Sequence, residues 1–252
     1  MTVLVVGAGT MGRWIGETLA TPIAFADADP DVAATAADAV TDARTAPLDP
    51  THPDAGPGEY AAVCVAVPMT AAADVIAAQA SRARDAVVDV AGEMIGPVSA
   101  MREHAPDRER LSLHPLFAPA NAPGTIAAVH DAPGPVTDAL RESLTAAGND
   151  VFDTTIAEHD DAMESVQAAT HAAILAWRLA ATDVREEFHT PLSRELADLA
   201  THVTGQEPRV YADIATRYDA GRDALADAAT EIADADRERF LELFDDARDQ
   251  TQ

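Results

Sequence analysis

The sequence predicts an α/β domain with a doubly wound, mostly parallel sheet, followed by an all-α domain. Short apolar runs rich in valine, alanine and isoleucine recur along the first 153 residues, and stretches with helical character separate them. This alternation is typical of parallel β-α-β units. After about residue 155, helical periodicity continues almost to the end, and we predict no further strand there. We therefore expect an α/β domain over residues 1–153 and a helical domain over residues 154–252.

Seven apolar runs of the first domain have the length and composition of buried strands. They span residues 3–6, 22–26, 61–67, 86–90, 110–113, 125–129 and 150–152. Helices are expected up to about residue 19 and then over residues 30–40, 70–82, 97–104 and 134–147. Residues 47–58 are dense in proline, glycine and aspartate, which indicates a surface loop.

The helical domain carries two apolar stripes with residues three and four apart, as on one face of a helix. The first contains Met163, Val166, Gln167, Thr170, His171 and Ile174, and the second Leu192, Leu196, Leu199 and Val203. Thr190 is a candidate N-cap for the second helix, with Pro191 at its first position. A final helix is expected from about Asp234. The stripes are compatible with an interface between two copies of the chain and equally with a core inside one copy.

The charge of the chain excludes some classes of partner. The formal net charge is −26, and all 17 basic residues are arginine. Such a surface repels nucleic acids and anionic membranes. Salt at molar strength shortens the Debye length to about 3 Å and screens the repulsion among acidic residues. We therefore expect a halophilic protein whose fold loosens at low salt.

Other features bear on the compartment and on metals. No apolar run is long enough to cross a bilayer, and no signal segment precedes the first strand, so we expect a cytoplasmic protein. The single cysteine, Cys64, excludes an internal disulfide and a multi-cysteine metal site. No group of side chains has a convincing spacing for metal ligands, and no metal is expected.

A glycine-rich turn follows the first strand. Gly7, Gly9 and Gly12 have the G-x-G-x-x-G spacing, with Thr10 and Met11 between the last two. In such a turn the first glycine permits the tight bend, the second lets the backbone approach a pyrophosphate, and the third allows close packing of helix on strand. Because the motif lies between a predicted buried strand and a helix, it predicts a Rossmann domain that binds a dinucleotide.

Asp27 indicates which dinucleotide is bound. It ends the second predicted strand about 20 residues after the glycines, where an acidic residue bonds the ribose hydroxyls. A carboxylate there accepts a free 2′-hydroxyl and repels a 2′-phosphate, so NAD is favoured over NADP. Asp29 is a competing candidate, but its position before Pro30 suits a helix entry better.

A series of segments resembles the prephenate dehydrogenase family. H-P-L-F-A-P, starting at His114, is similar to the family's H-P-M-F-G-P signature. A-E-H-D at 157–160, Q-A-A-T-H at 167–171, T-P-L-S-R-E-L at 190–196 and E-P-R-V-Y-A-D-I at 207–214 look like the next landmarks, in the family's order. The resemblance covers nearly the whole chain, which is too short for the fused chorismate mutase or regulatory domain of some relatives.

The resemblance implies oxidation and decarboxylation of prephenate to 4-hydroxyphenylpyruvate with NAD+, in tyrosine biosynthesis, by a homodimer. It implies that His114 takes the proton of the substrate hydroxyl, a task that suits a neutral imidazole. Arg194 matches an arginine that binds a substrate carboxylate, and His171 a substrate-binding histidine. Pro68 is expected to shape the loop under the nicotinamide ribose, or only to end its strand. His159 is interpreted as structural.

The chain also departs from the family's pattern. Where relatives have a serine and, two positions later, a lysine, this chain has Gly92 and Met94, and Ala118 replaces the glycine of the signature. Three alternatives stay open; Gly92 and Met94 support the third of them, and the His114 segment argues against the second. One is an arogenate dehydrogenase, and another is a different dehydrogenase that packs a Rossmann domain on helices. The third is a non-catalytic NAD-binding regulatory protein.

Overall fold

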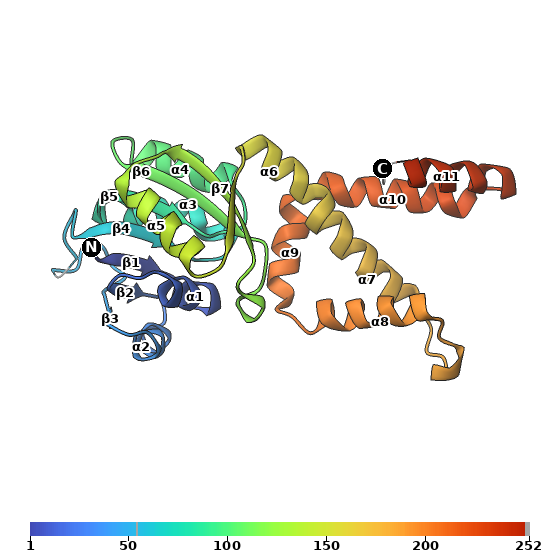
Figure 1. The fold of residues 1–252 in the computed structure, drawn as a ribbon, viewed down its shortest axis with the longest axis horizontal. Coiled ribbons are helices and arrows are strands. Elements are labelled where there is room, and N and C mark those ends of the chain that lie inside the picture. The colour runs from blue at the N-terminus through green and yellow to red at the C-terminus, as the bar shows by residue number, and fades with distance from the viewer. Residues whose placement is uncertain (54, 250–252) are drawn as a thin grey trace. The chain divides into compact units, whose positions relative to one another are not determined.

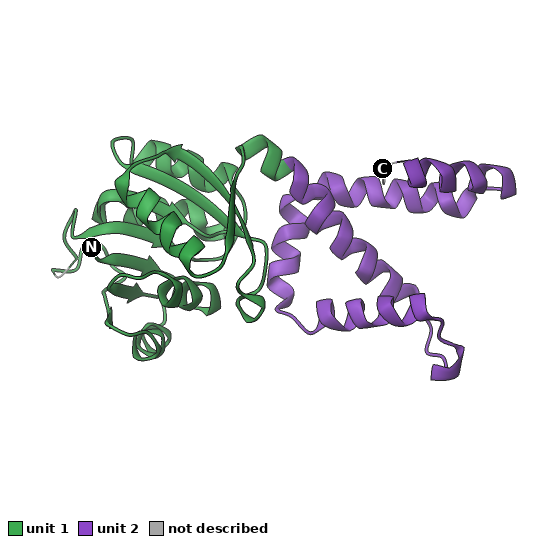
Figure 2. Cartoon of the chain, viewed as in Figure 1, with its two compact units in different colours: residues 1–160 green, residues 161–252 purple. Residues whose placement is uncertain are grey.

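The computed structural model describes residues 1–53 and 55–249. The chain divides into two compact units, Met1–Asp160 and Asp161–Gln252 (Figure 2). The first is an α/β unit and the second consists of helices (Figure 1). The predicted fold class is confirmed.

The α/β unit is built on one eight-stranded sheet with the strand order β3-β2-β1-β4-β5-β6-β7-β8 (Figure 1). The strands are β1 (Val3–Val6), β2 (Ile23–Ala26), β3 (Ala43–Thr45), β4 (Tyr60–Val65), β5 (Ala83–Asp89), β6 (Glu109–Pro115), β7 (Thr125–Ala132) and β8 (Asp150–Asp153). Neighbouring strands are parallel except β6 and β7, which are antiparallel. The carboxyl ends of β1, β4, β5 and β6 therefore meet at one edge of the sheet.

Alternate residues of the central strands belong to two different apolar cores. Val3 and Val5 of β1 pack into one core, while Leu4 and Val6 pack into the other. Because both faces are covered, such a strand is a continuous apolar run rather than an alternating one. Helices α1 (Thr10–Thr18), α2 (Pro30–Ala39) and α5 (Pro135–Ala146) contribute to the first core. Helices α3 (Met69–Gln79) and α4 (Ile95–His104) contribute to the second.

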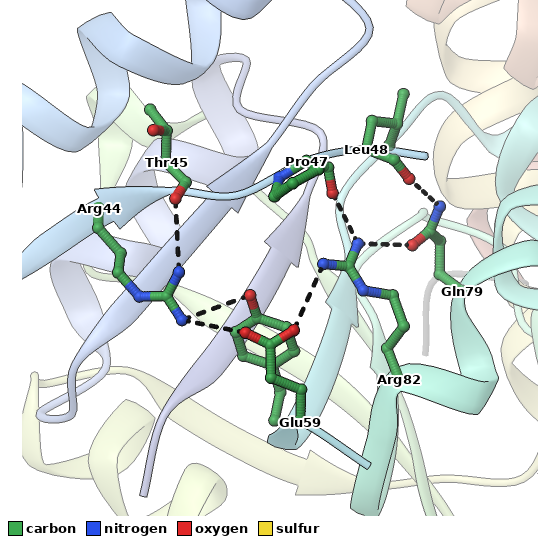
Figure 3. A network of polar contacts seen from close by, with 8 residues as sticks. Arg44, Thr45, Pro47, Leu48, Glu59, Gln79 and Arg82 are labelled. Atoms are coloured by element: carbon green, nitrogen blue, oxygen red, sulfur yellow. Dashed lines mark hydrogen bonds and ion pairs between the residues drawn. The ribbon is translucent and has the colours of Figure 1, made fainter. Parts of the chain in front are cut away.

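A buried arginine holds the proline-rich loop against the unit (Figure 3). Arg82 lies in a 3-10 turn after α3 and is almost fully buried. Its guanidinium donates to the carbonyl O of Pro47 (2.8 Å) and to Oε1 of Gln79 (3.0 Å). It also forms an ion pair with Glu59 (4.0 Å). Gln79 donates in turn to the carbonyl O of Leu48 (2.8 Å). These bonds fix the start of the loop although it has no regular structure.

The second unit contains α7 (Thr170–Ala180), α8 (Pro191–Thr204), α9 (Pro208–Arg217), α10 (Asp219–Asp234) and α11 (Arg237–Asp249). Helix α6 (Ile156–Met163) spans the boundary between the units, and a π-helical turn at Glu164–Ala169 connects it to α7. Among the described residues, no helix combines the length and apolar character needed to span a membrane.

The apolar stripes of the helical unit are only partly buried. Met163 and Val203 are buried, whereas Val166, Leu192 and Leu199 are more than half exposed. The π-helical turn widens the helix where the first stripe lies, so residues spaced three and four apart no longer share one face. The second stripe lies on α8, where Leu192 and Leu199 stay exposed to solvent in a single chain.

Candidate active site

The glycine-rich turn connects β1 to α1 as predicted. Gly7 has a φ of +94°, and a methyl group there would overlap the carbonyl O of Ala66. A methyl group at Gly12 would overlap the carbonyl O of Gly7, so the turn needs glycine at both positions. A Cβ at Gly9, in contrast, would have no heavy atom within 4 Å. The backbone at Gly9 is therefore open to a ligand.

Helix α1 begins beside a depression of about 310 Å³. No side chain caps its N-terminus, and its first turn has no acidic residue, so its amides and its positive dipole end suit an anion. The depression is lined by Ala8, Gly9, Thr10, Arg13, Asp31, Val32, Thr35 and Ala36. Met11 points instead toward the core, against which it packs. A phosphate group therefore fits at Gly9 and Thr10.

Asp27 lies directly against the glycine turn. Its Oδ2 accepts a hydrogen bond from the amide of Ala8 (2.7 Å), and its Oδ1 accepts one from the amide of Asp29 (3.0 Å). Asp29 is the N-cap of α2, where its Oδ1 accepts from the amide of Asp31 (2.9 Å). The two acids thus have different tasks, and Asp27 is the one beside the turn. Pro68 follows β4 and is the N-cap residue of α3.

His114 lies near the end of β6, with 7% of its surface exposed. Its Nδ1 lies 2.8 Å from Nε2 of His159, and Nδ1 of His159 lies 2.8 Å from Oδ1 of Asp160. The pKa of His114 is lowered to about 3, chiefly by burial and also by the neighbouring His159, while Asp160 opposes the shift. At neutral pH the imidazole of His114 is therefore uncharged, the form that accepts a proton.

Of the residues that depart from the family's pattern, Gly92 lies next to His114 and Met94 lies beside Ser112. Gly92 has a φ of +87°, and a Cβ built there would lie 3.3 Å from Nε2 of His114. Met94 is fully buried before α4, and its Sδ accepts a hydrogen bond from the hydroxyl of Ser112 (3.0 Å). Met94 therefore contributes no charge where relatives have a lysine.

A buried acid, Asp89, lies at the same edge of the sheet. Asp89 ends β5 beside Ser112 of β6, and its Oδ1 accepts a hydrogen bond from the amide of Ala91 (3.0 Å). Burial raises the pKa of Asp89 to about 7, because an ionised carboxylate is costly without water. Sequence reasoning missed Asp89, and also Asp160 as a partner of His159. The signal for Asp89 was an acid that directly follows the apolar run at residues 86–88.

The helical unit holds the two predicted substrate-binding residues. His171 lies on α7, and its ring packs edge-on against Tyr211 of α9, with centroids 4.6 Å apart. Burial lowers the pKa of His171. Arg194 lies on α8, is exposed, and donates to the carbonyl O of Glu186 (3.4 Å). Thr190 caps α8 by accepting from the amide of Ser193 (3.2 Å), as predicted.

No group of three or more histidine, cysteine or acidic side chains is placed to hold a metal ion within residues 1–53 and 55–249. Cys64 is buried in β4, and burial raises its pKa far above the ordinary range, so it is an inert core thiol.

Comparisons with known proteins agree with the motifs of the sequence. No protein-family model matches the chain. A curated 4-amino-4-deoxyprephenate dehydrogenase of Streptomyces pristinaespiralis is 35% identical over 164 residues, which span 59% of this chain and 55% of that protein. The chain thus matches about half the length of this relative.

Solved structures with the same fold cover the whole chain. Prephenate dehydrogenase from Aquifex aeolicus, in complex with hydroxyphenyl propionate and NAD+, has a TM-score of 0.72 and 16% identity, covering 100% of this chain and 96% of that one. Arogenate dehydrogenase from Synechocystis has a TM-score of 0.64 and 16% identity, covering 100% of both chains. The resemblance in the sequence is confirmed: this chain has the fold of prephenate and arogenate dehydrogenases, and its sequence is similar to that of a 4-amino-4-deoxyprephenate dehydrogenase.

Proposed function

We propose that this protein is an NAD+-dependent dehydrogenase that converts prephenate to 4-hydroxyphenylpyruvate, as a step of tyrosine biosynthesis. The observation that carries the proposal is the uncharged, buried His114 at the same sheet edge as the glycine turn and Asp27. A base and a dinucleotide cradle at this edge suit removal of a hydride and a proton from one alcohol carbon. Ligands of open α/β sheets bind outside the carboxyl ends of the strands.

The residues at the turn fit NAD+. Gly7 and Gly12 permit the bend, the open backbone at Gly9 admits a pyrophosphate, and Asp27 is placed for the ribose hydroxyls. A carboxylate at that position disfavours a 2′-phosphate, although Arg13 also lines the depression. When bound, NAD+ supplies the hydride acceptor. Pro68, which follows β4 and is the N-cap residue of α3, is proposed to border the nicotinamide side.

His114 is proposed to take a proton from the substrate and later to return it to the product. Nε2 accepts the proton of the ring hydroxyl while a hydride leaves the same ring carbon. Loss of the ring carboxylate as CO2 then delivers its electron pair to the ring, which becomes aromatic, and the phenolate oxygen takes the proton back. Prephenate and NAD+ thus give 4-hydroxyphenylpyruvate, CO2 and NADH.

Arg194 and His171 are proposed to bind the anionic groups of the substrate. The guanidinium of Arg194 is exposed at the start of α8, and its planar set of donors matches a carboxylate. The half-buried imidazole of His171 is held by the ring of Tyr211. Each residue is assigned by its match to the family's motif and by this local environment.

A second copy of this chain is the proposed partner of the helical unit. Leu179, Phe188 and Leu192 are 87%, 68% and 69% exposed, and α11 buries none of its residues. Large apolar side chains that are exposed in one chain become buried when a partner covers them. We expect light scattering in molar KCl to give the mass of a dimer, and the Leu192→Glu variant to give the mass of a monomer.

The chain is further proposed to work in a halophilic cytoplasm. Its net charge of −26 is spread over 252 residues without any lysine. We expect the midpoint of urea unfolding to fall as KCl is lowered, because repulsion among the acids is then less screened. A midpoint independent of KCl would contradict this.

Two alternative substrates follow from similar proteins: 4-amino-4-deoxyprephenate from the Streptomyces pristinaespiralis dehydrogenase, and arogenate from the Synechocystis enzyme. Gly92 favours a broader choice, since it offers no side-chain hydroxyl next to Nε2 of His114 to select a substrate hydroxyl over an amine.

The test is NADH formation by the purified chain in molar KCl with prephenate, arogenate or 4-amino-4-deoxyprephenate, each with NAD+ and with NADP+. We expect the highest kcat/KM with prephenate and NAD+. A higher value with another compound reassigns the substrate. No NADH with any of them, from folded protein that binds NAD+, would refute the proposal and favour a regulatory NAD-binding protein.

A further inference from the structure

A chain of three side chains leads from the surface of the α/β unit to His114. Asp160 lies 2.8 Å from Nδ1 of His159, and Nε2 of His159 lies 2.8 Å from Nδ1 of His114. His159 lies on α6 and His114 lies on β6, and the two histidines are 45 residues apart in sequence. The side chain of His159 is 1% exposed. A buried histidine pair with one carboxylate at its end has a preferred direction for its hydrogen bonds.

The chemistry of the carboxylate sets that direction. An ionised carboxylate only accepts hydrogen bonds, so Nδ1 of His159 must carry a proton and donate it to Asp160. In a neutral His159, Nε2 then holds a lone pair and accepts the proton on Nδ1 of His114. A neutral His114 with its proton on Nδ1 has its lone pair on Nε2, the nitrogen on the side of Gly92.

Asp160, His159 and His114 together form what we call the relay, and the elements around it hold it in place. The hydroxyl of Thr155 accepts from the amide of Glu158, and the carbonyl O of Thr155 accepts from the amide of His159, so the first turn of α6 is fixed. Oδ1 of Asp160 also accepts from the amide of Met94, 3.4 Å away, which ties α6 to the start of α4. The two imidazole rings meet edge to face, with centroids 5.1 Å apart.

We propose that His159, oriented by Asp160, is a positioning residue that keeps the proton of His114 on Nδ1 and the lone pair on Nε2. The catalytic part of this inference rests on the proposed function, in which Nε2 receives the hydroxyl proton of the substrate. When His114 becomes an imidazolium, its bond to His159 becomes charge-assisted and strengthens at the moment of reaction. His159, which the sequence indicated as structural, thereby acts on the reaction through His114.

Two variants of His159 separate positioning from packing. His159→Leu removes the acceptor, while His159→Gln places an amide oxygen near the position of Nε2 and can restore it. We expect kcat of His159→Leu to fall by about 10²–10⁴-fold, the range for a misplaced general base. His159→Gln is expected to recover most of this loss. The KM for substrate and the affinity for NAD+ should stay near wild type in both. His104→Leu, on the exposed end of α4, is the matched control and should retain wild-type kcat.

The protonation pattern is measured directly by nitrogen-15 NMR of histidine-labelled protein at neutral pH, without substrate. The signals of His114 are assigned by their loss in His114→Gln. We expect a protonated Nδ1 and an unprotonated Nε2 in the wild type and in His159→Gln, and a shift toward protonated Nε2 in His159→Leu. A protonated Nε2 in the wild type would overturn the inference, and so would a wild-type kcat in folded His159→Leu. Absence of turnover in the wild type with the expected NMR pattern would refute the proposed function alone.

Discussion

Replacing Asp89 by asparagine is expected to stabilise the α/β unit at neutral and alkaline pH. Asp89 is fully buried at the end of β5, where its Oδ1 accepts the amide of Ala91. Burial raises its pKa from 3.8 to about 7. Asparagine has nearly the same shape, keeps an oxygen for the amide of Ala91, and does not titrate.

The magnitude follows from proton linkage. Above pH 3.8 the unfolded chain releases the proton of Asp89, whereas the folded chain retains it up to about pH 7. The folded state binds more protons in this window, so stability is lost as the pH rises through it. At about 1.4 kcal/mol per pH unit over about three units, the loss amounts to about 4 kcal/mol. Asp89→Asn should remove this loss.

The assay is urea unfolding in molar KCl at several pH values from 4 to 8. The stability difference between Asp89→Asn and wild type should be smallest at pH 4, grow up to about pH 7, and then stay constant. Asp38→Asn, exposed on α2, is the control and should follow the wild-type pH dependence. A difference that does not change with pH would refute the reasoning that Asp89 retains its proton in the folded state.

Three further substitutions test separate parts of the structure. Gly12→Ala should weaken NAD+ binding by more than about tenfold in titration calorimetry, because the new methyl group would overlap the carbonyl O of Gly7. Unchanged affinity for NAD+ would contradict the role of the turn. Gly92→Ala should cost about 1–2 kcal/mol in urea unfolding, since φ is +87°, and equal stability would contradict this. Arg82→Leu should lower the free energy of unfolding by about 3 kcal/mol. The kcat should stay unchanged, because a partner of Arg82 lies in the loop that starts at Pro47. A lower kcat would contradict this and connect the loop to the site.

The order of the strands and helices could be predicted because each central strand is buried on both faces. Such strands are continuous apolar runs, and the glycine turn marks where the first one ends. The edge strand β3 escaped prediction, because its three residues Ala-Arg-Thr are partly or fully exposed and have no apolar signature. The π-helical turn before α7 also escaped, since its residues keep ordinary helical composition.

The candidate site could be predicted only where a motif carries it. The glycines, Asp27 and His114 follow from spacing and resemblance. The relay does not, because nothing local in the sequence indicates that the start of α6 lies against the end of β6. For the same reason Gly92 could be recognised as a departure, but its place next to Nε2 of His114 comes from the fold. Long-range pairing of this kind depends on the sheet as a whole.

The central claim is that His114 is the base of an NAD+-dependent dehydrogenase. The most direct test is the kcat of His114→Ala for NADH formation from prephenate, with NAD+ affinity measured on the same sample. The account predicts a kcat at least about 10²-fold below wild type, with NAD+ affinity unchanged, because the glycine turn and Asp27 are untouched. A kcat equal to that of the wild type would contradict it and assign His114 to the packing of β6.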